Sequence, residues 1–308
     1  MLQRFFVALN LEYFLMKAPW VLGLLLLAGH FDIAAQSFYA SRRPRSLILV
    51  AGTGTSTYFG ELANPGDYFD ARPNLSVGLQ YYVTQRIGLR SEASWFQIAG
   101  ADSESSSTGR IPRNLSFRSN NFEINLTGLI NVLPNGLRFY QRPGFNVYGF
   151  GGVGFLYFNP TTEYQGSRYA LRPLQTELVS YSRAVLVIPF GMGARFKLGP
   201  MFNISLEGGY RKTFTDYLDD VSTVHFDASR FTDPVAAALS DRRPELGLSR
   251  VEEGTKRGNP ATDDGYFLAN VKIEYYLPTN FLVRNKLYSK KRKNYGGKPN
   301  RRLSQKRR

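Results

Sequence analysis

The sequence contains no cysteine and only two histidines among its 308 residues. Without cysteine, disulfide frameworks, thiolate metal sites and cysteine nucleophiles are excluded. Scarce histidine argues against histidine-rich metal sites and most acid–base enzymes, because histidine is the side chain that titrates near neutral pH. No apolar run reaches the about 20 residues that a membrane-spanning helix needs. We therefore expect no catalytic residue, no metal site and no cofactor.

Positive charge is abundant, but it is concentrated at the carboxyl end. The formal net charge is +15, and residues 286–308 contain eleven positive side chains and no acidic one. The remaining net charge of residues 36–285 is about +4, so the body of the chain is nearly neutral. The eleven are Lys286, Lys290, Lys291, Arg292, Lys293, Lys298, Arg301, Arg302, Lys306, Arg307 and Arg308.

The amino-terminal region has the features of an export signal. Residues 18–29 form a 12-residue apolar run, which is too short to cross a bilayer and fits the hydrophobic region of a signal peptide. Ile33 and Ala35 can occupy the −3 and −1 positions of a cleavage site before Gln36. We expect residues 1–35 to be a signal peptide.

The segment before this run is unusual for a signal peptide, because it contains the acidic Glu12 and a second apolar stretch. A start at Met16, followed by Lys17, gives a compact leader. We therefore expect Met16 to be the biological start. We interpret residues 36–45 as a short periplasmic lead-in.

After the leader the pattern is period-two alternation of apolar and polar residues, which is typical of strands. This alternation predicts eight strands in an all-β chain, an even number. The predicted strands are 46–58, 74–83, 87–99, 119–132, 145–159, 184–198, 201–213 and 266–276.

The predicted connections alternate between short and long. The links after the second, fourth and sixth strands are short, and the other links are long and polar. Short turns at one end and long loops at the other are typical of an antiparallel transmembrane barrel of the bacterial outer membrane. We expect such an eight-stranded barrel over residues 46–278, with long loops extracellular and both termini periplasmic. A soluble barrel or sandwich with one buried face is the alternative.

Charges in these strands fall on the less apolar face, as expected if the other face contacts lipid. Since an eight-stranded barrel is only wide enough for its own side chains, we expect a filled lumen and no diffusion pore. Cations and anions on this face can pair with one another. The predicted lumen charges are Arg90, Glu92, Glu123, Arg195, Lys197, Glu207, Arg211, Lys272 and Glu274.

Three motifs suggest chemistry, and each has a plainer interpretation. Residues 149–154 match the G-x-G-x-x-G dinucleotide pattern, but no helical pattern follows, so small residues in a curved strand explain them better. Ser222 and His225 lie in the last long loop, where a solvated histidine is a simpler interpretation than an enzyme's nucleophile and base. Residues 216–220 contain three aspartates, but their spacing does not match an EF-hand calcium loop.

The same loop contains one helix signal. Asp233 followed by Pro234 and then by helix-forming residues is a capping residue with proline at the first helical position. We expect a short surface helix there.

Three segments together resemble the PorG-like outer-membrane barrels of Bacteroidota, over about residues 46–276. They are the end of the first predicted strand, the aspartate-rich segment after the seventh, and a segment before the eighth. The residues that carry the resemblance are Tyr58, Phe59, Gly60, Asp216, Tyr217, Asp219, Asp220, Arg257, Gly258, Asn259 and Pro260. That family is associated with the type IX secretion apparatus, in which the barrel is linked to a periplasmic ring containing lipoproteins. The resemblance implies a structural, non-enzymatic role in protein export or gliding.

The basic tail, residues 279–308, has the composition of a disordered segment that would hang in the periplasm. Its charge favours electrostatic docking onto an acidic periplasmic partner, and a solvated tail is the alternative. The expected partners are outer-membrane lipids and periplasmic ring or lipoprotein components, with no nucleic acid and no small-molecule substrate. Three competing functions remain open: a lipid-modifying barrel enzyme, an outer-membrane barrel unrelated to secretion, and a soluble nucleic-acid binder.

Overall fold

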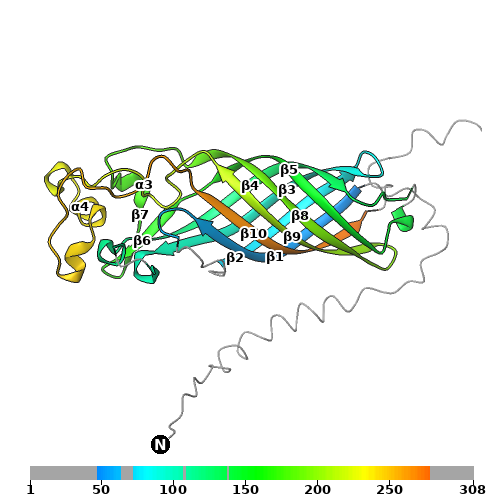
Figure 1. Cartoon of the computed structure of the whole chain (residues 1–308), viewed down its shortest axis with the longest axis horizontal. Helices are drawn as coiled ribbons and strands as arrows, with labels where there is room; N and C mark the ends of the chain where they lie inside the picture. The colour runs from blue at the N-terminus through cyan, green and yellow to red at the C-terminus, as the bar shows by residue number, and fades with distance from the viewer. Residues whose placement is uncertain (1–46, 64–71, 107–108, 137–138, 278–308) are drawn as a thin grey trace, which may run out of the picture. The chain divides into compact units, whose positions relative to one another are not determined.

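The computed structural model describes residues 47–63, 72–106, 109–136 and 139–277, and these residues form a closed antiparallel barrel (Figure 1). The eight barrel strands are β1 (Leu47–Phe59), β2 (Arg72–Tyr82), β3 (Ile87–Ala101), β4 (Ser116–Asn131), β5 (Phe145–Tyr157), β8 (Ala184–Leu198), β9 (Phe202–Thr213) and β10 (Gly265–Tyr276). Each barrel strand pairs with the next one in this order, and β10 pairs with β1, which closes the barrel. In the described part of the chain, no helix is long and apolar enough to cross a membrane. The predicted fold class is confirmed.

Alternation along each strand separates an outer apolar face from an inner polar face. In β4, Ile124 and Leu126 are exposed outside the barrel, whereas Glu123 and Asn125 are buried inside it. Large apolar side chains are exposed in the same way on all eight strands. In water such a surface would be unfavourable, so the burial pattern is that of a barrel surrounded by lipid.

Aromatic side chains mark both edges of the apolar band. At the loop edge, Trp95, Phe122 and Tyr157 lie on neighbouring strands, and above them Gln97 donates a hydrogen bond to Asn120 (2.7 Å). The turn edge has a similar row, made of Tyr81, Phe145, Phe196, Phe202 and Tyr275. Aromatic girdles at both interfaces are typical of outer-membrane barrels.

One charge departs from the expected placement. Lys212 is exposed on the outer face of β9, next to Asp263, with Nζ and the carboxylate 3.6 Å apart. The expectation that every strand charge faces inward was wrong here, because β9 continues beyond the apolar band at its loop end.

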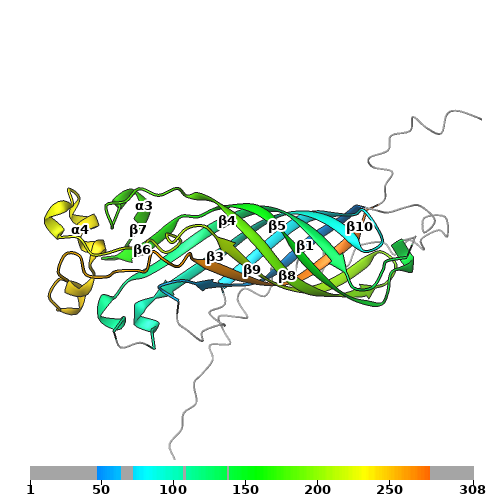
Figure 2. The same cartoon turned by 45° about the horizontal axis from the view of Figure 1, so that its top comes forward.

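The connections differ in length as predicted (Figures 1 and 2). Residues 83–86 and 199–201 form short links at one end, where the 3₁₀ turn η4 (Phe139–Gln141) also lies. The loop end carries the remaining short helices of the described chain and two short strands. These are η2 (Asp102–Glu104), η3 (Ile111–Arg113), β6 (Pro160–Tyr164), β7 (Ser167–Ala170), α3 (Leu171–Leu174), η5 (Ala228–Arg230), α4 (Pro234–Ser240) and η6 (Arg243–Leu246).

Within these loops, one element was predicted and one was not. Helix α4 is confirmed, because the Asp233 side chain accepts a hydrogen bond from the amide of Val235 (2.8 Å) at its start. The β6–β7 hairpin was predicted as loop. It continues the barrel wall upward, because β6 pairs with the first residues of β4.

The glycine run 149–154 lies inside β5 and is followed by strands. A Cβ on Gly152 would lie 2.0 Å from the carbonyl oxygen of Leu126, so the close approach of β4 and β5 requires glycine there. The dinucleotide interpretation does not fit this position.

Apolar residues close the lumen at both ends. At the turn end Ile48, Val50, Met201 and Tyr276 form one buried cluster, which also settles which face of β1 points inward. A larger cluster lies at the loop end, where the rings of Phe96 and Tyr266 stack with centroids 4.7 Å apart. The polar lumen therefore lies between two apolar layers.

Candidate functional site

The middle of the lumen is crossed by a buried ion-pair network. Lys272 on β10 donates hydrogen bonds to Glu92 (2.7 and 2.9 Å) and to Glu207 (2.7 Å). Arg90 binds Glu207 with two nitrogen–oxygen distances of 2.7 and 3.0 Å, and Tyr148 donates to the same carboxylate (2.9 Å). All four charged side chains are at most 2% exposed. The network bridges β3, β5, β9 and β10 and fills the centre of the barrel.

Two further ion pairs flank this network. Toward the turn end, Arg195 donates to Glu274 (2.8 Å), and its guanidinium carbon lies 4.3 Å from the ring centre of Tyr148. Toward the loop end, Arg211 lies 3.7 Å from Glu123, which also accepts a hydrogen bond from Tyr266 (2.6 Å). Each charge in the network and in these two ion pairs thus has a partner of opposite charge, which offsets the cost of burying it in the lumen.

Lys197, the ninth predicted lumen charge, does not join this network. It is half-buried near the turn end of β8, and its Nζ donates to the carbonyl of Tyr140 (2.9 Å). The register of β8 places it below the layer of carboxylates.

Arg142, which was not predicted from the sequence, seals the turn end. Its Nε donates to Asn203 (2.6 Å), its other nitrogens donate to three carbonyls of the β8–β9 turn region, and its guanidinium covers the ring of Tyr276. It lies in the connection between β4 and β5, which has no strand periodicity that would have indicated this role.

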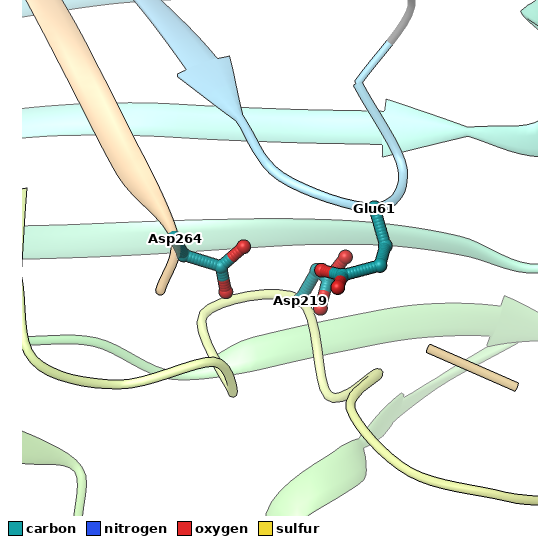
Figure 3. Close-up of side chains that lie close together, drawn as sticks. All are labelled: Glu61, Asp219 and Asp264. Atoms are coloured by element: carbon teal, nitrogen blue, oxygen red, sulfur yellow. The ribbon is translucent and has the colours of Figure 1, made fainter. Parts of the chain in front are cut away.

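At the loop end, three carboxylates from the β1–β2 and β9–β10 connections face one another (Figure 3). Glu61 follows β1, Asp219 follows β9 and Asp264 precedes β10, and one oxygen of each lies within 4.8 Å of the others. Tyr58 donates to Asp264 (2.6 Å), and the amide of Leu62 donates to Asp219 (3.3 Å). We call Glu61, Asp219 and Asp264 the carboxylate cluster.

Burial shifts the acidity of these groups. It raises the pKa of Asp219 and of Asp264 well above the usual range, and the neighbouring carboxylates add to both shifts. Burial also raises the pKa of Glu61, and that of the nearby Asp216 to about 7. The cluster is therefore a place where negative charge is poorly compensated.

A second group of polar side chains lies beside the cluster. Asp220 accepts a hydrogen bond from Tyr181 (2.6 Å), and burial raises its pKa to about 6. Arg257 binds Glu177 (2.6 Å) and the carbonyl of Asp220 (2.7 Å). Glu177 also accepts from the amides of residues 222 and 223, so one ion pair joins the β5–β8 connection to the β9–β10 connection.

The residues that carry the family resemblance thus meet at one end of the barrel, although they are far apart in sequence. Phe59 packs near Tyr210, Tyr217 stacks on Tyr181 with centroids 4.7 Å apart, and Pro260 is exposed. Among the rest, a Cβ on Gly258 would clash with the backbone of Ser222, and the amide of Asn259 donates to Glu61 (3.0 Å). Gly60 lies against the hydroxyl of Tyr58.

Ser222 and His225 are both buried, at 2% and 4% exposure, and no hydrogen bond joins them in the described chain. His225 Nδ1 has no partner there, and burial lowers the pKa of the imidazole to about 4. The expectation of a solvated loop histidine was wrong, because the long loop folds over this side chain. The pair also lacks the contact that a nucleophile and its base require.

Several predicted features lie outside the described residues. They are the signal peptide 1–35, the lead-in 36–45, and the tail 279–308 with its eleven basic side chains.

Two buried acids of the loop end, Glu177 and Asp264, were not predicted from the sequence. Neither lies in a strand pattern, and only the folded structure shows their contacts with the motif residues Arg257 and Tyr58.

A family model for the outer membrane protein beta-barrel domain matches residues 23–232. The chain belongs to this outer-membrane barrel family. The match agrees with the closed eight-stranded barrel and its apolar outer band, and it supports a location in the outer membrane. No curated protein matches the chain.

Solved structures with the same kind of fold include three outer-membrane proteins. The N-terminal barrel domain of Pseudomonas aeruginosa OprF is 9% identical, with 75% of this chain and 97% of that chain covered and a TM-score of 0.35. Neisserial surface protein A is 6% identical, with coverages of 75% and 97% and a TM-score of 0.38. The outer membrane enzyme PagL is 10% identical, with coverages of 75% and 99% and a TM-score of 0.31. Likenesses this distant carry no conclusion about function.

Proposed function

We propose that this chain is a structural, non-enzymatic component of a type IX protein secretion or gliding machine. In this role the barrel anchors periplasmic ring and lipoprotein components to the outer membrane. The observation that carries the proposal is the cross-lumen network of Arg90, Glu92, Glu207 and Lys272, which fills the barrel. A barrel with a filled lumen serves better as an anchor than as a conduit.

The loop end supports the same proposal. The residues that resemble the PorG-like barrels of Bacteroidota gather around Asp219, Asp264 and Arg257, where contacts join the β1–β2, β5–β8 and β9–β10 connections. A rigid cap built from these particular residues fits a shared structural role.

The basic tail supplies the means of docking in this proposal. An even number of strands puts both ends of the barrel on one side of the membrane, and we place that side in the periplasm. Residues 286–308 contain eleven positive charges and no acid, a composition that suits salt-sensitive attraction to an acidic surface.

A lipid-modifying enzyme is the less supported alternative. Ser222 and His225 are buried and have no hydrogen bond between them in the described chain. Replacing both should leave lipid A and phospholipid profiles unchanged. A changed lipid profile in the double variant would favour the enzyme.

The proposal is tested by deleting the gene and measuring export of type IX cargo into the medium. Export should fail in the deletion strain and return with the full chain. Normal export in the deletion strain would contradict the proposal and favour the alternative, an outer-membrane barrel unrelated to secretion.

The tail is tested with three variants of the full chain: a deletion of residues 286–308, a tail with its eleven Lys and Arg replaced by Gln, and a scrambled tail that keeps all eleven charges. Heat-dependent mobility in gels checks that each barrel is folded. The scrambled tail should still recover periplasmic ring proteins on purification, and the deleted and neutral tails should not. Equal recovery with the neutral tail would reject electrostatic docking.

A further inference from the structure

The carboxylate cluster at the loop end lacks a compensating cation from the protein. Asp219 and Asp264 are each 1% exposed. In the described chain no ion pair includes either of them or Glu61. Buried carboxylates of this kind must be neutralised by protons or by a bound cation.

The two nearest arginines are already engaged elsewhere. Arg113 binds both oxygens of Asp102 (2.7 Å each) and also the carbonyl of Arg257. The Arg257 guanidinium binds Glu177 and a backbone carbonyl. Neither guanidinium lies within ion-pair distance of the cluster.

A fourth acid provides an independent sign that this place binds a cation. Asp216 is only 7% exposed, yet within the described residues neither of its carboxylate oxygens forms a hydrogen bond of good geometry, and the buried Oε2 of Glu61 forms none either. The Ser222 side chain is the neighbour that favours the charged form of Asp216, and it carries no charge. The turn that carries Asp216 closes around Asp264, since the carbonyl of Thr215 accepts from the amide of Asp264 (3.0 Å) and the amide of Leu218 donates to its carboxylate (2.9 Å). Repulsion acts between Asp216 and both Glu61 and Asp264, as expected if these carboxylates face one space.

We propose that Glu61, Asp219 and Asp264, together with the unpartnered carboxylate of Asp216, bind a calcium ion. All the donors are oxygens, which suit a hard cation, and there is no cysteine in the chain and no histidine among the four. Calcium takes six to eight oxygen ligands in flexible geometry, whereas magnesium demands a near-ideal octahedron. The ligands come from connections without regular helix or strand geometry, which impose no octahedral arrangement, and this favours calcium over magnesium.

The backbone hydrogen bonds at the cluster leave room for this ion. Amides of Val221 and Leu62 each donate to one oxygen of Asp219, and a carboxylate oxygen has a second lone pair to offer. They orient the carboxylates before the ion binds. Calcium would then fasten the β1–β2 connection to both ends of the β9–β10 connection.

The experiment uses the full chain folded in detergent micelles, treated with a chelator and titrated with calcium chloride at pH 7.5 in a calorimeter. We expect one site with a dissociation constant in the range of about 0.1–1 mM, as for extracellular calcium modules, and at least about tenfold weaker binding of magnesium. Two isosteric variants, Asp219→Asn and Asp264→Asn, should each lower calcium affinity at least about tenfold. Glu163→Gln is the matched control, because Glu163 is an exposed acid on β6 whose carboxylate pairs with Arg168, and this variant should bind calcium as the wild type does.

Heat-dependent gel mobility identifies which variants are folded, and only folded protein is titrated. The proposal is overturned if the folded wild type binds no calcium, which would mean that protons neutralise the cluster. It is also overturned if both Asn variants bind calcium with wild-type affinity. Neither result depends on the proposed role in secretion.

Discussion

Removing Lys272 from the lumen should destabilise the barrel strongly. In Lys272→Met, the three hydrogen bonds to Glu92 and Glu207 are lost, and Arg90 becomes the only cation for both carboxylates. Removing one partner of a buried ion pair typically lowers the free energy of unfolding by about 3–5 kcal/mol. We expect a loss of this size in the free energy of unfolding.

A double variant separates the ion pair from the packing of the lysine stem. In Lys272→Met with Glu92→Gln, the remaining pair of Arg90 and Glu207 keeps its bidentate contact. The double variant should therefore be more stable than the sum of the single losses, by about 1–3 kcal/mol.

The assay is urea unfolding in lipid vesicles, followed by the fluorescence of Trp95 on β3. Lys197→Met is the matched control, because the ammonium of Lys197 donates a hydrogen bond only to the carbonyl of Tyr140 among the residues that the structure describes, and a hydrogen bond to a neutral acceptor contributes about 1 kcal/mol to stability. Equal losses in Lys272→Met and Lys197→Met, or strict additivity in the double variant, would refute the cross-lumen network as a source of stability.

Three further predictions follow from the barrel wall, the lumen and the long loop. In planar bilayers the purified barrel should show no large steady conductance, since paired side chains fill the lumen, and a large conductance would contradict the filled barrel. Gly152→Val should abolish the heat-dependent gel shift of the folded barrel, because the added Cβ meets the Leu126 carbonyl at 2.0 Å, while Gly144→Ala, with open space around it, should fold normally. Below pH 6.5 the contribution of His225 to the stability of its loop should be lost, because the pKa of the imidazole is about 4 when folded and about 6.5 when unfolded, so the unfolded state takes up the proton first. The raised pKa values of Asp216 and Asp220 act in the opposite direction, so the contribution of His225 is the difference between the wild type and His225→Gln. Between pH 7 and pH 5 the free energy of local opening of the wild type, relative to that of His225→Gln, should fall by about 1–2 kcal/mol, measured by hydrogen exchange corrected for intrinsic rates, and an unchanged difference would contradict this cause.

The strands could be predicted from sequence because the two environments of the barrel wall impose a period of two. The predicted strand 184–198 coincides with β8, whereas β4 begins at Ser116, earlier than predicted. The reason is that the first residues of β4 lie beyond the apolar band, where Arg118 is exposed and β6 is the neighbouring strand. Outside lipid the alternation that marks a strand is no longer required.

The pairing of charges could not be predicted in the same way. Alternation places Arg90 and Glu207 on inner faces, but only the tilt and stagger of the closed barrel bring β3 opposite β9 across the lumen. The carboxylate cluster could not be predicted either, since Glu61 lies in the β1–β2 connection and Asp219 and Asp264 lie 45 residues apart in the β9–β10 connection, and neither connection has a strand periodicity.

The central claim is that this barrel anchors a periplasmic assembly, and crosslinking in intact cells tests it most directly. An amine-reactive crosslinker, followed by affinity purification and mass spectrometry, reports which proteins lie beside the tail lysines Lys290, Lys291 and Lys298. We predict crosslinks from these lysines to ring or lipoprotein components of the periplasm, weakened when the cells are permeabilised in high salt. Tail lysines that crosslink to no periplasmic protein, in cells where the barrel is folded in the outer membrane, would contradict the claim.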